Sequence, residues 1–93
     1  MTLSEIIRNE KLNNIEIEIR EYLPEETLRQ MREQALYDID EIMKIKPDYF
    51  AGLCRYSNGR YTALDDDIYS GDWEVEKYQI VIENGHKYLR VWI

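Results

Sequence analysis

The stretch Ile15-Glu16-Ile17-Glu18-Ile19-Arg20 decides the fold, because apolar and charged side chains alternate strictly along it. Successive side chains of a β-strand point to opposite faces. This period of two therefore predicts a strand with three isoleucines inward and its charges outward. A strand with one apolar face needs a second layer to cover that face.

Two helices are predicted around this strand. Thr2-Leu3-Ser4-Glu5 fits a capping box, which predicts a short helix over about residues 3–11. A longer amphipathic helix is predicted over residues 24–46, where Pro24 suits the first position and Pro47 stops the helix. Its apolar stripe consists of Leu28, Met31, Ala35, Ile39, Ile42 and Met43. We expect this long helix to lie across the sheet as its second layer.

Two Asn-Gly pairs separate strand-like runs and predict β-hairpins, because both central residues of a type I′ turn need positive φ. The pairs are Asn58-Gly59, between residues 53–57 and 60–64, and Asn84-Gly85, between residues 75–83 and 86–93. The sequence thus predicts one α+β domain over residues 1–93, with a mainly antiparallel sheet of about five strands.

The run before Asn84 has an ambiguous beginning. In one continuous strand, Trp73 and Val75 would point to the opposite face from Tyr78 and Ile80. Either a bulge intervenes near residues 76–78 or the strand begins later.

Bulk composition describes a globular chain, with 93 residues of which 44% are hydrophobic and 33% charged. No apolar run is long enough to span a membrane, and the first residues lack the basic and apolar regions of a secretory signal. Cys54 is the single cysteine, so an internal disulfide is impossible. We therefore expect a cytoplasmic protein.

Charge is distributed unevenly along the chain. Residues 61–76 hold six acids and no Lys or Arg, whereas the other 77 residues hold 13 acids and 12 bases. Almost all of the net charge of −7 therefore lies in one stretch. This acidity argues against direct binding to nucleic acid or anionic membranes and permits binding to a basic partner.

Catalytic and metal-binding patterns are weak. Cys54 and His86 could form a nucleophile–base pair, but a cysteine in a predicted strand is usually a buried, inert thiol. Asp65-Asp66-Asp67 fits a calcium loop in neither register, and acid–base catalysis by paired carboxylates needs a cleft that so small a domain seldom offers. We expect no enzymatic activity, no cofactor and no metal site.

The stretch from Tyr61 to Glu76 interleaves aromatic residues with its acids. One interpretation is a solvated acidic connection between strands. The other is a partner-binding surface, in which aromatic anchors are surrounded by charge and the row Asp72, Glu74 and Glu76 resembles a row of phosphates. On that hypothesis the partner-binding residues are Tyr61, Asp65, Asp66, Asp67, Tyr69, Asp72, Trp73, Glu74 and Glu76.

Four segments carry a resemblance to known proteins. Met1–Ile7 leading into Ile15–Arg20, together with Tyr61–Ser70 and Leu89–Trp92, resembles small proteins of phages and mobile elements in Gram-positive bacteria, which include anti-CRISPR proteins. The resemblance implies an inhibitor that blocks the nucleic-acid surface of a protein such as a Cas effector. The alternative is a structural or assembly subunit that self-associates through its sheet, and the oligomeric state is left open.

Overall fold

The computed structural model describes residues 1–33, 47–65 and 68–93. Its elements are, in chain order, α1 (Leu3–Asn9), β1 (Ile15–Tyr22), α2 (Glu25–Glu33), β2 (Asp48–Ser57), β3 (Arg60–Ala63), β4 (Lys77–Glu83) and β5 (His86–Trp92). The predicted α+β class is confirmed.

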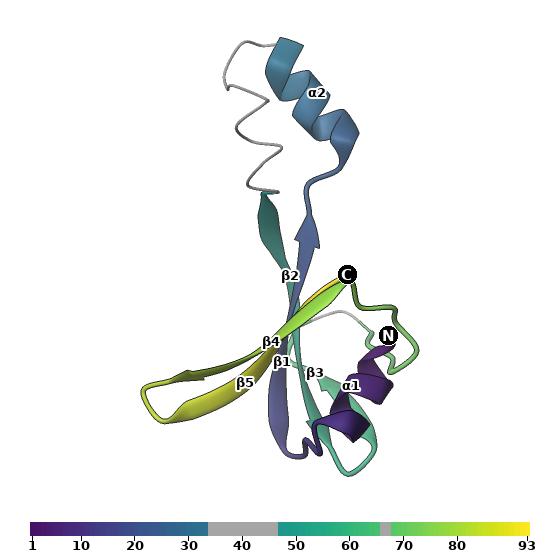
Figure 1. Ribbon diagram of the computed structural model, residues 1–93, viewed down its shortest axis with the longest axis vertical. Helices are drawn as coiled ribbons and strands as arrows, with labels where there is room; N and C mark the ends of the chain where they lie inside the picture. Colours follow the sequence, from purple (N-terminus) through teal and green to yellow (C-terminus); the bar gives the residue numbers. More distant parts are fainter. Residues whose placement is uncertain (34–46, 66–67) are drawn as a thin grey trace.

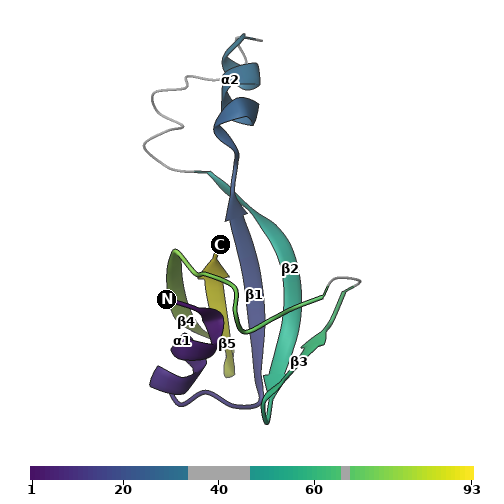
Figure 2. The ribbon, with the colours of Figure 1, turned by 90° about the vertical axis from the view of Figure 1, so that its right-hand side faces the viewer.

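The five strands form one mixed sheet in the order β3-β2-β1-β5-β4 (Figure 2). β1 lies at the centre, where it pairs antiparallel with β2 and parallel with β5. The pairings of β2 with β3 and of β4 with β5 are antiparallel. The first strand of the chain is therefore a direct neighbour of the last.

Alternation along β1 builds the hydrophobic core. Ile15, Ile17 and Ile19 are buried, and their register places them beside Leu89 and Val91 of β5 on the same face. Residues that pair side by side in a sheet project to the same face, so these side chains form one apolar layer.

That layer is covered by α1, whereas the sequence predicted the longer helix as the covering layer. Thr2 and Glu5 form the predicted capping box, and the helix presents Leu3, Ile6 and Ile7 to the core. Figure 1 shows α1 beside the lower part of the sheet. A short helix suffices because its three large apolar side chains all point to one side.

The described part of α2 does not lie against the sheet. Figure 1 shows it beyond the ends of β1 and β2, and its buried Leu28 is not part of the core cluster. The remainder of the helix predicted over residues 24–46, from residue 34 on, lies outside the described residues.

Two-residue turns join β2 to β3 and β4 to β5. Asn58 and Gly59 have φ values of 49° and 86°, and Asn84 and Gly85 have values of 50° and 77°. Asn and Gly tolerate this left-handed conformation best. β4 begins at Lys77, two residues later than predicted. Because Val75 lies outside the strand, it need not point to the same face as Tyr78 and Ile80.

Candidate protein-binding site

Residues 64–76 connect β3 to β4, and their described part from residue 68 on crosses the face of the sheet that α1 covers (Figure 2). The second half of this connection lies beside the start of the chain. The backbone N–H of Leu3 donates to the carbonyl of Trp73 at 2.9 Å, and the N–H of Val75 donates to the carbonyl of Met1 at 2.8 Å. These hydrogen bonds hold the connection to the body of the fold.

The three aromatic residues predicted as anchors are partly buried against the core. The ring centroids of Tyr69 and Trp73 lie 5.3 Å apart, and the ring centroids of Tyr61 and Tyr56 lie 5.0 Å apart. Burial raises the pKa of the Tyr61 hydroxyl to about 12. The structure therefore places these rings where they hold the connection against the sheet.

Asp65 is engaged within the fold. Its Oδ2 atom accepts the backbone N–H of Leu53 at 2.9 Å and the hydroxyl of Tyr69 at 2.5 Å. This carboxylate therefore satisfies a backbone donor of β2 and orients the Tyr69 ring. Asp66 and Asp67 lie outside the described residues.

Asp72, Glu74 and Glu76 are exposed, whereas the intervening Trp73 and Val75 turn inward. We call these three carboxylates the acidic row. Glu74 pairs with the N-terminal ammonium at 3.1 Å, and the other two acids form no ion pair within the part of the chain that the structure describes. Asp72 and Glu76 therefore present negative charge to solvent, whereas the charge of Glu74 is paired with the N-terminal ammonium.

Two apolar residues of the same connection point outward, and sequence reasoning missed both. Leu64 is 49% exposed and Ile68 is 88% exposed. In an irregular connection no sequence period shows whether an aliphatic side chain points inward or outward. The acidic, turn-rich stretch around Ile68 nevertheless indicates a surface location. Together with the acidic row they give the connection both apolar and charged exposed groups.

The other face of the sheet carries a ladder of ion pairs. Glu18 of β1 pairs with Arg20 and with Arg90 of β5, and Arg20 in turn pairs with Asp48 at 2.9 Å. Hydrogen bonds from Arg20 and Trp92 hold the pKa of Asp48 below its ordinary value. These charges neutralise one another within the fold, so this face offers less net charge than the acidic row does.

Cys54 and His86 project from opposite faces of the sheet. Cys54 pairs with Ile17 and shares its buried face, whereas His86 bonds Glu16 at 3.1 Å on the other face. Burial, with a smaller contribution from Asp65, raises the pKa of the Cys54 thiol to about 12. The two side chains are therefore not placed to act as a nucleophile and its base.

The described residues contain neither a metal-ligand cluster nor a helix able to span a membrane. Within residues 1–33, 47–65 and 68–93, no group of three or more His, Cys, Asp or Glu side chains is placed to hold a metal ion. Among the described helices, none combines the length and apolar character needed to cross a membrane.

No protein-family model matches the chain, and neither a curated protein nor a solved structure matches it.

Proposed function

We propose that the protein is a non-catalytic, cytoplasmic protein-binding module that uses the acidic row to dock on a basic surface of another protein. One observation carries the proposal: Asp72, Glu74 and Glu76 all face solvent while the residues between them are held against the core. A charged row on a fixed backbone is preorganised, which lowers the entropy cost of binding.

The negative charge of the row favours a partner that handles nucleic acid, because surfaces that bind phosphates are lined with Lys and Arg. Asp72 lies in a turn, Glu74 in a single bridge to Thr2 and Glu76 in a bend, so the row resembles nucleic acid in its charge and not in a regular spacing. A groove lined with Lys and Arg could therefore accept the row in place of a phosphate backbone. The charge of the acidic row and the resemblance to mobile-element proteins together support an anti-CRISPR-like inhibitor whose partner is a Cas effector.

The exposed groups of residues 64–76 would contribute in different ways. Solvent-exposed carboxylates act mainly by steering the encounter, since rim charges change association rates more than affinity. Ile68 and Leu64 supply the exposed apolar contact area of the segment. Tyr69 and Trp73 contribute by holding the backbone of the row in place.

The test compares two triple variants with equal changes in net charge. Asp72→Asn with Glu74→Gln and Glu76→Gln removes the acidic row. Glu25→Gln with Glu26→Gln and Glu33→Gln removes three exposed acids of α2 and serves as the control. Association with purified Cas effectors lacking guide RNA is measured at several salt concentrations.

We expect the row variant to associate roughly tenfold more slowly at low salt, with a flatter salt dependence, because steering is lost. The control variant should associate as fast as the wild type, and guide RNA should compete with the wild type for the effector. Equal slowing in both triple variants would show that only net charge matters. An absence of competition by guide RNA would remove the phosphate-mimic explanation.

A further inference from the structure

β4 is an edge strand whose outer side is unpaired. It pairs only with β5, and within the described part of the chain no segment pairs with its other side. β3, the opposite edge, has 4 residues, whereas β4 has 7. Figure 1 shows the hairpin of β4 and β5 extending away from the rest of the fold. A long free edge is a template for pairing with another strand.

Hairpin geometry identifies which backbone groups are free. Glu83 and His86 flank the two-residue turn, so they form its hydrogen-bonded closing pair. Hydrogen-bonded and non-hydrogen-bonded pairs alternate along an antiparallel ladder. The backbone N–H and C=O groups of every second residue of β4 therefore point away from β5. The residues with outward N–H and C=O groups are Tyr78, Ile80 and Ile82.

The side chains of this edge are also unprotected. Ile82 is 70% exposed and Tyr78 is 36% exposed, which is unusual for large apolar groups at regular strand positions. Edge strands are commonly shielded by proline, by a bulge or by charge along the strand. In β4 the charges lie only at its two ends, at Lys77 and Glu83.

We propose that β4 pairs antiparallel with β4 of a second copy, in a register centred on Ile80. Ile80 then faces Ile80 of the second copy, and Tyr78 faces Ile82. All three outward residues of each strand find a hydrogen-bonding partner. At the ends, Lys77 of each copy faces Glu83 of the other, which gives two cross-strand pairs of opposite charge. The two sheets become one ten-stranded sheet.

The charges select this register over its neighbours. A shift by two residues in one direction places Lys77 opposite Val81, and a shift in the other direction places Glu83 opposite Gln79. Either shift separates both charge pairs and leaves one outward residue of each strand without a partner. A shift by one residue would pair outward backbone groups with inward ones, so it is excluded.

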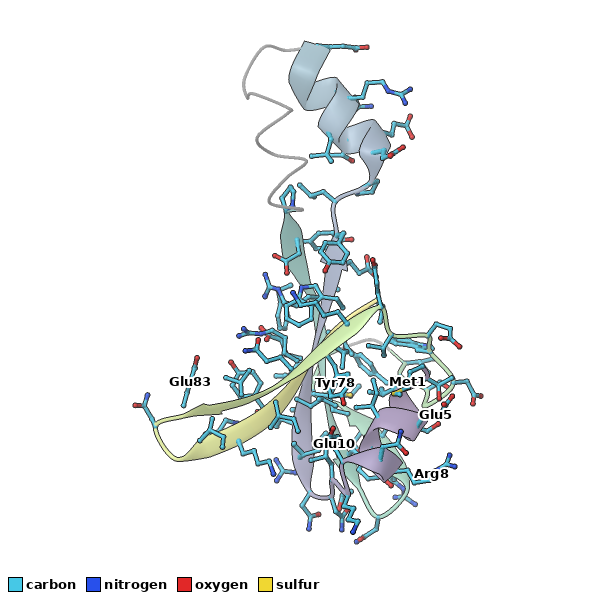
Figure 3. The ribbon with its side chains drawn as sticks, in the orientation of Figure 1. Met1, Glu5, Arg8, Glu10, Tyr78 and Glu83 are labelled. Atoms are coloured by element: carbon cyan, nitrogen blue, oxygen red, sulfur yellow. The ribbon has the colours of Figure 1, made fainter. Side chains whose placement is uncertain are left out.

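The shape of the molecule accommodates the pairing. Figure 3 shows Glu83 near the free end of the hairpin, whereas Tyr78 lies nearer to Glu10, the residue that follows α1. Antiparallel pairing places the thin end of one hairpin beside the thicker region of the other copy. The Tyr78 hydroxyl donates to Glu10 at 2.7 Å, and the Lys77 ammonium lies 4.4 Å from the Trp92 ring centroid, so both groups are already ordered.

Charge reversal provides the first test, with self-association measured by analytical ultracentrifugation over a range of concentrations. We expect the wild type to dimerise and Lys77→Glu or Glu83→Lys to raise the dissociation constant about tenfold or more, because both pairs become like-charged. The double variant Lys77→Glu with Glu83→Lys should restore dimerisation. A wild type that stays monomeric, or a double variant no better than the single ones, would overturn the proposal.

A cross-linking test reads the register directly in a Cys54→Ala background. Ile80→Cys places two thiols across the symmetry axis, with Cα atoms about 5.5 Å apart, within the range for a disulfide. Ile82→Cys is the control, because it is more exposed but lies far from its counterpart in this register. Under mild oxidation Ile80→Cys should cross-link at least tenfold faster. Faster cross-linking of Ile82→Cys would exclude this register.

This inference is independent of the function proposed above. The triple variant that removes the acidic row should dimerise like the wild type, since none of its three positions lies in β4.

Discussion

The indole N–H of Trp92, in β5, donates a hydrogen bond to the carboxylate of Asp48, in β2, although β1 lies between these two strands. The same carboxylate accepts a hydrogen bond from Arg20 of β1 at 2.9 Å. One side chain thus connects three adjacent strands at one end of the sheet, on the face opposite α1.

Removing this connection should lower stability. Asp48→Ala leaves the Trp92 N–H and the Arg20 Nε–H without their acceptor, and an unsatisfied group of this kind costs about 1–3 kcal/mol of unfolding free energy. Urea unfolding followed by circular dichroism measures the change. Arg60→Ala, at an exposed position of β3, is the control and should change stability by less than about 0.5 kcal/mol. Equal losses in the two variants would contradict this role for Asp48.

The same carboxylate should make stability depend on pH. Its folded pKa lies below the ordinary value of 3.8, so the ionised form contributes stability above that value and loses it as pH falls through the lowered folded pKa. The stability difference between the wild type and Asp48→Asn should therefore be constant near neutral pH and shrink below pH 3.8. Unfolding curves of both proteins from pH 2 to pH 7 provide the measurement, and a difference unchanged at pH 2 would contradict it.

Cys54 should behave as a structural thiol. Its raised pKa leaves almost no thiolate at neutral pH, and burial blocks access, so a thiol reagent should react about a hundredfold or more slowly than with the urea-unfolded chain. Cys54→Ser should destabilise the fold more than Cys54→Ala, since a buried hydroxyl needs a hydrogen-bonding partner. Reaction rates that match those of the unfolded chain would refute this assignment.

Gly52 makes room for the Tyr69 ring, which Asp65 orients. A Cβ atom at this position would overlap the Tyr69 hydroxyl and approach its Cζ atom to 3.0 Å. Gly52→Ala should therefore cost about 1–3 kcal/mol through overpacking. In a Tyr69→Phe background, where the hydroxyl is absent, the cost should fall. A double-mutant cycle with thermal unfolding measures this coupling, and an equal cost in both backgrounds would show that the two sites are independent.

Local patterns predicted much of the fold. The alternation at Ile15–Ile19 identified β1, and the capping box at Thr2 identified α1. The parallel pairing of β1 with β5 was missed, because periodicity shows which face of a strand is apolar and not which strand lies beside it. The covering layer was assigned to the longer helix on length alone, whereas the shorter apolar stripe of α1 performs this role.

The candidate site was predictable only where polar and apolar residues alternate. Over residues 72–76 the alternation matches the burial, because Asp72, Glu74 and Glu76 are exposed whereas Trp73 and Val75 turn inward. In the irregular part of the connection no period exists, so sequence could not show that Tyr69 turns inward and Ile68 outward. The internal hydrogen bonds of Asp65 depend on tertiary proximity to Leu53, which composition does not encode.

The central parallel pairing has a consequence for how the protein is made. β1 leaves the ribosome early, but its neighbour β5 is synthesised last among the described elements. Until then the apolar face of Ile17 and Ile19 lacks Leu89 and Val91, and the edge of β1 that β5 will occupy is open. The nascent chain therefore carries the unpaired edge of β1 until β5 has been synthesised, and an unpaired strand edge is prone to aggregation.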